Sequence, residues 1–440
     1  MGERIRGTRS VCPVCLKNLP ADLIREPDGS IVLEKNCPEH GGFRVPVWQG
    51  KMDFDRWLLE TEPLSPEEGL SCPGNCGICP EHEIGTCCAL LEVTDRCNLR
   101  CRYCFADGGR QTPDPAREEC EAAIRNIVRQ CGQPLLQFSG GEPTLRDDLP
   151  ELVRFARGAG CSYTQVNTNG IRLAEDPDYA ARLKDAGLDI VFLQFDGTRD
   201  GIYEVLRGRP LLETKLEAVR VCAELGLGVT LVPTVVPGVN DGNLGELIRL
   251  AASLSPAVRG IHFQPVSFFG RYPGAPQAAD RYTLDRLMAD ISAQAGIPEE
   301  SFLPSRCDHP LCGFHSNFLI RPDGSLKPLS SITHSAHSRG CERDNREYVA
   351  RHWKRQPEEQ KPRGGQAGEF AEEMDFDTFL YQLRHRSLAL SAMAFQDAMN
   401  LNIERLHRCS LHVYDRGTIK PFCAKYLSPF LPEPEEKETP

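Results

Sequence analysis

A run of three cysteines, Cys97-x3-Cys101-x2-Cys104, constrains this chain more than any other feature. Three thiolates at this spacing can hold three irons of a cubane iron–sulfur cluster and leave the fourth iron without a protein ligand. That iron is then free to bind a substrate or cosubstrate. The motif therefore predicts a reactive cluster rather than a purely structural one.

The sequence around this motif strengthens the prediction. An apolar run at 89–94 predicts a strand that leads into the cysteine loop. A second predicted strand, at 134–138, leads into the run SGGEP. Within that run, Gly140 and Gly141 let the backbone approach a ligand without a clash from a Cβ atom. The two strand ends together predict a ligand site.

On these motifs, residues 89 to about 270 resemble the radical S-adenosylmethionine (SAM) enzymes. In that family SAM binds the open iron of a [4Fe–4S] cluster and is cleaved to a 5′-deoxyadenosyl radical, which abstracts hydrogen from the substrate. The resemblance implies that Cys97, Cys101 and Cys104 hold this cluster and carry catalysis. It also implies that Glu142 accepts a hydrogen bond from the SAM ammonium group and that Tyr103 packs beside the adenine.

Strands and helices alternate along the same region, which predicts a parallel sheet. The strand candidates are 89–94, 134–138, 162–167, 189–196, 228–235 and 260–266. Amphipathic helices are expected near 117–131, 148–158, 178–186, 211–225 and 243–253. The fold class is thus α/β, and the resemblance implies a partial (β/α)6 barrel over residues 89–280.

Polar residues lie where the predicted strands end, and ligands of such sheets bind at the carboxyl ends of the strands. The candidates for contact with SAM or substrate are Asn167, Asn169, Gln194, Asp196 and Gln264. Two of them precede glycine, in Asn169-Gly170 and Asp196-Gly197, and could equally be ordinary turn residues.

Residues 1–50 form a small module of their own with two pairs of metal ligands. The ligands are Cys12, Cys15, Cys37 and His40, in the order C-x2-C and C-x2-H. This order predicts a knuckle around one metal, with a hairpin turn at 26–30 between the pairs. Zinc suits three cysteines and one histidine, and a mononuclear, rubredoxin-like iron is the alternative.

Residues 51–88 carry a second triad, Cys72-x3-Cys76-x2-Cys79, with the same spacing as the first. No glycine-rich strand follows it directly, and Ile78 takes the place of the aromatic residue. We therefore predict an auxiliary [4Fe–4S] cluster here. Its fourth ligand stays open between Cys87, Cys88, His82 and a distant cysteine.

The remaining residues, 281–430, are predicted to form a C-terminal region with a further auxiliary cluster. Its four candidate ligands are Cys307, Cys312, Cys409 and Cys423. A hairpin is expected at 318–326 and a helix at 379–390. The charged, glycine-containing stretch 354–368 predicts a mobile linker, and the acidic residues 431–440 predict a disordered tail.

Composition excludes several classes of protein. The 440 residues include 20 cysteines, which in a chain this long and without an apparent secretory signal favours metal binding over disulfides. The net charge of −11 argues against a nucleic-acid partner. The cysteines inside predicted regular elements, at 120, 131, 161 and 222, are expected to be buried hydrophobes. We predict a cytoplasmic protein and leave peripheral membrane contact open.

The order of motifs along the whole chain resembles the tetraether lipid synthases and the related pterin-methylating radical SAM proteins. The resemblance is carried by CPGNCGICPEH, DRCNLRCRYCF and MAFQDAMNLNIERLHRC. It implies carbon–carbon coupling of lipid alkyl chains, or methylation of a pterin-like heterocycle as the alternative. Either activity needs an electron donor such as ferredoxin or flavodoxin. The alternative hypothesis from another functional class is a multi-cluster electron-transfer protein. Such a carrier would need no SAM-binding pocket.

Overall fold

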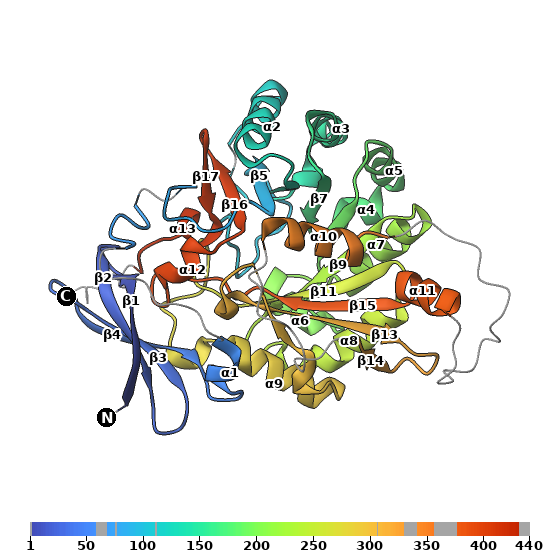
Figure 1. The fold of residues 1–440 in the computed structure, drawn as a ribbon. Helices are drawn as coiled ribbons and strands as arrows, with labels where there is room; N and C mark the ends of the chain where they lie inside the picture. The colour runs from blue at the N-terminus through green and yellow to red at the C-terminus, as the bar shows by residue number, and fades with distance from the viewer. Residues whose placement is uncertain are drawn as a thin grey trace, which may run out of the picture.

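The computed structural model describes residues 2–58, 68–74, 77–110, 112–305, 307–329, 341–355 and 376–430. Cys76, most of the predicted linker and the predicted tail lie outside these residues. The chain forms a small sheet at the N-terminus and a large curved sheet surrounded by helices (Figure 1).

The N-terminal sheet is an antiparallel meander of β1 (Glu3–Val11), β2 (Asn18–Arg25), β3 (Ile31–Cys37) and β4 (Gly41–Trp48). Alternate residues of the strands, such as Leu23 and Leu33, are buried, as expected for a sheet with one covered face. The predicted hairpin turn is confirmed: the Glu26 amide donates to the Ser30 carbonyl at 2.8 Å.

The six predicted strands of the large sheet are all present and all run parallel. They are β5 (Cys88–Thr94), β6 (Leu135–Gly140), β7 (Tyr163–Thr168), β8 (Ile190–Gln194), β9 (Gly228–Val232) with the short β10 (Thr234–Val235), and β11 (Val258–Pro265). The predicted helices are also confirmed, as α2 (Arg117–Cys131), α3 (Leu149–Ala159), α5 (Pro177–Asp185), α7 (Leu212–Glu224) and α8 (Leu244–Ser253). The predicted fold class, a parallel α/β sheet beside a metal-binding module, is therefore correct.

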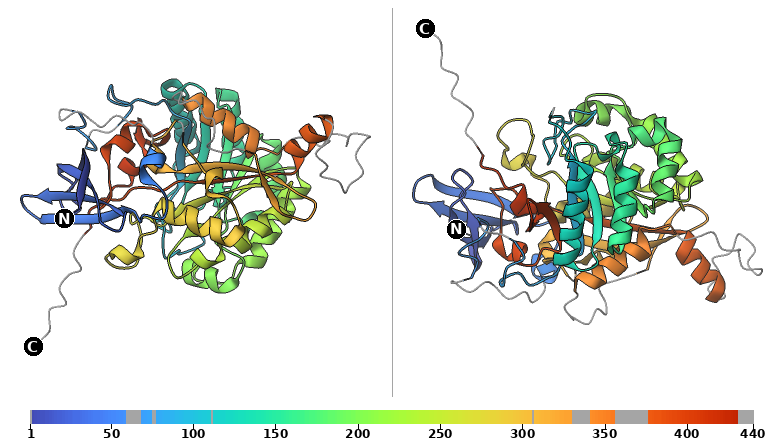
Figure 2. Two further views of the ribbon diagram at one scale, coloured as in Figure 1. Left: turned by 60° about the horizontal axis from the view of Figure 1, so that its bottom comes forward. Right: turned by 90° about the horizontal axis from the view of Figure 1, so that it is seen from above.

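Two shorter helices on the same connections were not expected from the sequence. They are α4 (Ile171–Glu175) and α6 (Asp200–Arg207). Together with the longer helices they lie on the outer side of the curved sheet (Figure 2). The cysteines at 120, 161 and 222 are buried there, as expected, and Cys131 packs against the same core.

The C-terminal region extends the same sheet at both ends. β15 (Ser387–Ala392) pairs in parallel with β11, and β16 (Leu411–Asp415) pairs in parallel with β5. The full order is β12-β13-β15-β11-β9-β8-β7-β6-β5-β16-β17. The outer strands are β12 (Leu303–Pro304), β13 (Phe314–Ile320), β14 (Leu326–Pro328) and β17 (Thr418–Pro421). The hairpin predicted at 318–326 is the antiparallel pair β13 and β14.

One predicted element is wrong in part. A helix was expected over 379–390, but α11 (Phe376–His385) ends before β15 begins at Ser387. Every residue of β15 is buried between β11 and β13, so strand pairing prevails over a local pattern that suits a helix. At the start of the predicted linker, Lys354 is bound in place, since its ammonium group lies 2.7 Å from the Asp189 carboxylate.

Five further helices complete the described part of the fold. They are α1 (Phe54–Leu58), α9 (Leu284–Ala295), α10 (Glu342–His352), α12 (Ile403–His407) and α13 (Phe422–Lys425). After α10, the ring of Trp353 lies 5.5 Å from that of Phe192 on β8 and 5.5 Å from that of His262 on β11. This end of α10 therefore packs against inward-facing side chains of the sheet.

The N-terminal sheet is fastened to the loop before α12. The buried ammonium group of Lys35 donates to the carbonyls of Ala398 at 2.9 Å and Met399 at 2.7 Å. The Ser10 hydroxyl donates to the Leu401 carbonyl at 2.5 Å. Because these donors satisfy backbone carbonyls that are out of water, the first and last parts of the chain form one packed unit.

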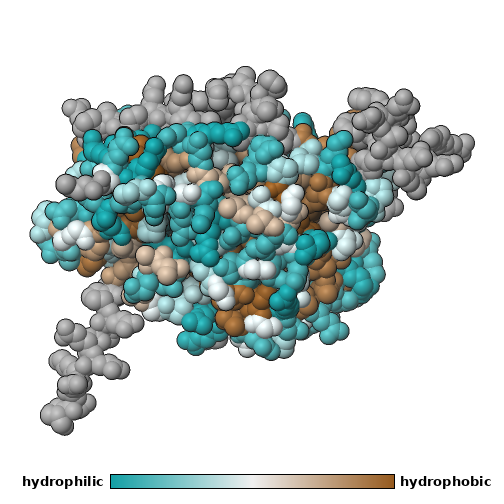
Figure 3. All heavy atoms as spheres, turned by 90° about the horizontal axis from the view of Figure 1, so that it is seen from below, coloured by the Kyte–Doolittle hydropathy of each residue, from teal (hydrophilic) through white to brown (hydrophobic). Residues whose placement is uncertain are grey.

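Few large hydrophobic side chains are exposed in the described ranges. No helix among the described residues is both long and apolar enough to cross a bilayer. The face in Figure 3 is largely hydrophilic, with apolar areas interrupted by polar side chains. The exposed large hydrophobic residues in the described ranges are Leu70, Ile78 and Val205.

Candidate active site and metal centres

The glycine pair after β6 allows close packing against the cysteine loop. A Cβ atom on Gly140 would lie 2.2 Å from the Thr94 carbonyl oxygen, and one on Gly141 would lie 2.2 Å from that of Arg96. Gly140 also has a φ of +121°, which other residues rarely adopt. The sequence led us to expect space for a ligand, whereas the structure shows that the glycines first make space for the loop that carries Cys97.

A cavity of about 130 Å³ lies where this loop meets the ends of the strands. The thiols of Cys97, Cys101 and Cys104 all line it. The predicted cofactor-binding residues on its wall are Tyr103, Gly140, Gly141, Glu142, Asn167, Asn169, Gln194 and Gln264. The fold thus brings together residues from five strand ends, as expected for a site at the carboxyl edge of a parallel sheet.

Glu142 is held rigidly in this cavity. One of its carboxylate oxygens accepts hydrogen bonds from the Thr144 hydroxyl and the Thr168 hydroxyl, each at 2.6 Å. The other oxygen accepts one hydrogen bond, from the backbone amide of Asn169 at 2.7 Å. A carboxylate oxygen has two lone pairs, so the second oxygen can still accept a bond from a ligand ammonium group.

Asp196 does not line the cavity, although its sequence position suggested a ligand contact. Its carboxylate forms a two-pronged ion pair with Arg207, with distances of 2.7 and 2.5 Å. Both side chains are buried, and Arg207 does reach the cavity wall. The role that the geometry supports for Asp196 is to orient Arg207, because a buried guanidinium needs a partner.

The residues around the cavity suit an iron–sulfur cluster and SAM. Burial raises the pKa of the Cys97 thiol to about 12, so a cluster that binds it as a thiolate displaces a proton. The Gln194 side-chain oxygen is buried and accepts no hydrogen bond from the described residues, which leaves it available to a ligand. Binding of the cluster by the three cysteines stays a prediction.

A second cavity of about 320 Å³ adjoins the first. The two share wall residues, which are Phe105, Asn167, Gln264, Phe395 and Phe422. The second cavity lies on the inner side of the sheet. Its polar wall includes Gln137, Gln165, His262, Asp308, Asn345 and Ser391, and rings of Phe192 and Trp353 face it. A substrate bound here would lie next to the cysteine loop.

The site residues predicted from the sequence do not include the inward-facing Gln137, Gln165 and His262. A periodicity signal was available, because side chains of a strand alternate between its two faces. Gln165 lies two residues before Asn167, and His262 two residues before Gln264, so each shares a face with a residue that was chosen. A glutamine on the same strand face as a predicted site residue indicates a ligand cavity rather than a core.

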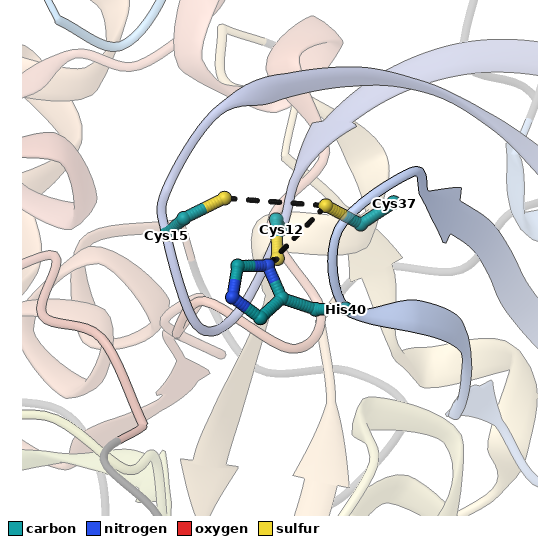
Figure 4. A group of neighbouring side chains, drawn as sticks. All are labelled: Cys12, Cys15, Cys37 and His40. Atoms are coloured by element: carbon teal, nitrogen blue, oxygen red, sulfur yellow. Dashed lines mark hydrogen bonds between the residues drawn. The ribbon is translucent and has the colours of Figure 1, made fainter.

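The four predicted ligands of the N-terminal module converge (Figure 4). The His40 Nδ1 atom lies 3.6 Å from the Cys12 sulfur and 3.5 Å from the Cys37 sulfur. The Cys15 and Cys37 sulfurs are 4.0 Å apart. These separations suit four ligands around one tetrahedral zinc ion.

Replacing Cys12 by Ser is expected to release this metal and to lower the free energy of unfolding by about 3 kcal/mol or more, because a small module folds around its metal. Metal analysis and thermal melting measure both effects. The Cys222→Ala variant, which changes a cysteine far from any ligand group, is the control. Unchanged metal content and melting in the Cys12 variant would contradict the assignment.

The second triad is described only in part. Cys76 lies outside the described residues, while Cys72 is buried with its sulfur 3.6 Å from the Nε2 atom of His407. Of the fourth ligands considered, Cys88 lines the second cavity and His82 contacts the Cys409 carbonyl at 2.9 Å. The structure thus places His407 beside Cys72, a contact that the sequence did not suggest.

The four late cysteines are buried or partly buried. Burial, and after it the nearby Cys423 and Asp308, raises the pKa of the Cys409 thiol. Cys307 instead donates to the Cys341 carbonyl at 2.5 Å. Both Cys307 and Cys312 line the second cavity, so a cluster in this region would lie near a bound substrate. Ligation by these four cysteines remains a prediction.

Comparison with known proteins agrees with these observations. Residues 91–251 match the radical SAM superfamily, and residues 4–49 match a domain described as the HMPTM N-terminal zinc ribbon. The 7,8-dihydro-6-hydroxymethylpterin dimethyltransferase of Methanocaldococcus jannaschii is 34% identical over 98% of this chain and 95% of its own. The GTP 3′,8-cyclase of Petrotoga mobilis is 26% identical, with 54% of this chain and 79% of its own covered.

Among solved structures, a methylornithine synthase aligns with 48% of this chain and 63% of its own, with 13% identity and a TM-score of 0.37. The near full-length match to the pterin dimethyltransferase establishes the family. The chain belongs to the radical SAM superfamily and is an enzyme that uses a [4Fe–4S] cluster and SAM.

Proposed function

We propose that this enzyme transfers a methyl or other one-carbon unit to a pterin-like heterocycle by a radical route. The observation that carries the proposal is the wall of the second cavity, where amide and imidazole side chains face inward beside aromatic rings. A compact site with a few placed polar groups is typical of small-molecule recognition.

Two glutamines give this wall its hydrogen-bonding character. The Gln165 side-chain nitrogen donates to the Gln137 side-chain oxygen at 2.7 Å. The Gln165 oxygen is buried and accepts no hydrogen bond from the described residues. A pterin carries N–H donors and carbonyl and ring-nitrogen acceptors along one edge, so it can pair with such amides. A lipid chain cannot, and an unpaired buried polar group costs about 1–3 kcal/mol.

The aromatic part of the wall suits a flat ring. Phe192 and His262 have ring centroids 5.3 Å apart, and Trp353 contacts both. The indole N–H of Trp353 also has no hydrogen-bond partner among the described residues. A planar heterocycle can stack against these rings and accept a bond from the indole, which combines apolar contact with orientation.

When bound, the cluster and SAM supply a 5′-deoxyadenosyl radical that can remove a hydrogen atom from the substrate. The protein's part is to place the substrate and exclude water. Asn167 and Gln264 lie on the walls of both cavities and can orient groups on either side. The rings of Phe105, Phe395 and Phe422 surround the same junction and keep it apolar, which protects a radical from solvent.

The similarity to the 7,8-dihydro-6-hydroxymethylpterin dimethyltransferase of Methanocaldococcus jannaschii also favours a pterin over a lipid. Coupling of alkyl chains, the first hypothesis drawn from the sequence, would need a long apolar channel. A cavity of about 320 Å³ with six or more polar groups on its wall is a poor fit to that requirement. An external one-electron donor, such as ferredoxin or flavodoxin, would reduce the cluster.

The test is an anaerobic reaction of reconstituted enzyme with dithionite, SAM and 7,8-dihydro-6-hydroxymethylpterin. We expect the pterin to stimulate release of 5′-deoxyadenosine and to gain the mass of a methylene unit once a one-carbon donor is supplied. Deuterium at the reacting carbon should appear in 5′-deoxyadenosine. Stimulation by a lipid with terminal methyl groups, and none by the pterin, would reject the proposal in favour of lipid coupling.

A further inference from the structure

The segment that follows β11 is bonded to the loop that carries the first cysteine triad. The backbone amide of Arg271 donates to the Cys104 carbonyl at 2.9 Å, and the amide of Cys104 donates to the Arg271 carbonyl at 2.9 Å. The two residues form an isolated antiparallel bridge. The described residues between β5 and α2 contain no helix or strand, so this bridge is a fixed point in an otherwise irregular segment.

The side chain of Arg271 contacts the same loop at three more points. Its Nε atom donates to the Cys101 carbonyl at 2.9 Å. Its Nη1 atom lies 3.2 Å from the Gly108 carbonyl oxygen and 3.3 Å from a carboxylate oxygen of Asp107. A guanidinium group presents its donors in a rigid, planar fork. These contacts therefore restrict the shape of the loop more than a single ion pair would.

Gly270 allows this close approach. Its φ is +65°, and a Cβ atom at this position would lie 2.3 Å from the Cys104 carbonyl oxygen. Any side chain here would push the segment away from the loop. The segment is also held from its other side, because the Phe268 amide donates to the buried Asp397 carboxylate at 3.2 Å. Arg271 is thus carried by a segment that is itself fixed.

The contacts of Arg271 bear on the thiols that line the first cavity. Cys101 is 7% exposed, and no other described residue donates to its carbonyl, so Arg271 satisfies a polar group that is out of water. Arg271 itself lies on the cavity wall. The spacing of Cys101 and Cys104 limits how far apart their thiols can be, but it does not fix their directions. Hydrogen bonds to both backbone carbonyls fix the directions as well.

We propose that Arg271 is a positioning residue that holds the cysteine loop in the shape that receives the [4Fe–4S] cluster and leaves its open iron accessible to SAM. Arg271 acts through its hydrogen bonds to the loop carbonyls rather than through its positive charge. A lysine would keep the charge but not the planar fork, so the two effects can be separated. The proposal concerns the SAM site alone and does not depend on the identity of the substrate.

The experiment uses variants of the full-length, reconstituted protein without the heterocyclic substrate. In Arg271→Met, the KM for SAM in the uncoupled release of 5′-deoxyadenosine should rise about tenfold, because the loop is no longer held in place. The electron paramagnetic resonance spectrum of the reduced cluster should lose the change that SAM causes in the wild type. Arg271→Lys should show both effects. Gly270→Ala should show them too, because it displaces the same segment while Arg271 is kept.

Arg110 provides the matched control, because it binds the same carboxylate. Its guanidinium lies 3.0 Å from the second oxygen of Asp107, and its side chain is 60% exposed. Arg110→Met should keep the wild-type KM and spectrum. The proposal is overturned if Arg271→Met keeps both, or if Arg110→Met changes them equally.

The remaining variants test the role of charge and guard against misfolding. Full recovery in Arg271→Lys would assign the effect to charge and would overturn the proposal. If Arg271→Met does not fold, wild-type behaviour of both Arg271→Lys and Gly270→Ala would overturn it. Failure of the pterin to react would leave all these outcomes unchanged, because SAM cleavage is measured without substrate.

Discussion

Replacement of Cys97 by Ala is expected to abolish SAM cleavage and to lower the iron content by about four per chain. The thiol lines the first cavity together with Cys101 and Cys104, next to the buried carboxylate of Glu142. Two remaining cysteines cannot hold a cluster with one open iron in this position. The measurement is release of 5′-deoxyadenosine after anaerobic reconstitution, together with iron and sulfide analysis.

Two controls make this result specific. Cys222 is fully buried in α7 and packs with the apolar core, so Cys222→Ala should keep both iron and SAM cleavage. Cys72→Ala should lose iron but retain the capacity to bind and cleave SAM at the other triad. If the Cys97 variant still cleaves SAM and the Cys72 variant does not, the two triads have been assigned in the wrong order.

Replacement of Gln165 by Leu is expected to lower kcat/KM for the heterocyclic substrate by about 100-fold, while SAM cleavage without substrate continues. Leucine is similar in size, but it removes the amide that bonds to Gln137 and the oxygen that faces the cavity. The variant loses a hydrogen bond to the substrate and the hydrogen-bond partner of Gln137. Together these losses lower the stabilisation of the transition state by about 3 kcal/mol. Steady-state turnover of the pterin substrate and the uncoupled rate of 5′-deoxyadenosine release measure the two effects.

The control for this variant is Gln130→Leu, which changes a glutamine on the exposed side of α2. It should leave both rates unchanged. If Gln165→Leu has full activity on the pterin, the side-chain amides of the cavity wall do not contribute to substrate recognition. If instead it speeds turnover of a lipid substrate, the cavity is a channel for alkyl chains.

Much of the active-site loop was predictable because its geometry is local. Cys97, Cys101 and Cys104 lie within one short loop, so their spacing alone limits how far apart the thiols can be. The strands and helices from 88 to 265 follow from periodic patterns that repeat over short windows. The predicted metal ligands Cys12 and His40 were likewise identifiable from two short pairs and one hairpin turn.

The roles of polar residues in or next to the strands were harder to predict from the sequence. Asp196 sits at a strand end like a ligand residue, yet its carboxylate binds Arg207 behind the cavity wall. Gln165 lies in the middle of β7, yet its side chain lines the second cavity. A strand residue's role depends on which face of the sheet is hollow, and that is a property of the closed sheet rather than of the strand.

The cysteine triads, the alternating elements of the sheet and the N-terminal group of metal-type ligands could be predicted, because each depends on residues that are close along the chain. Three features emerged only from the folded chain: β15 and β16 join the sheet at opposite ends, Lys35 binds the loop before α12, and His407 contacts Cys72. These contacts join distant segments, and their formation depends on how the whole core packs, so no local spacing encodes them.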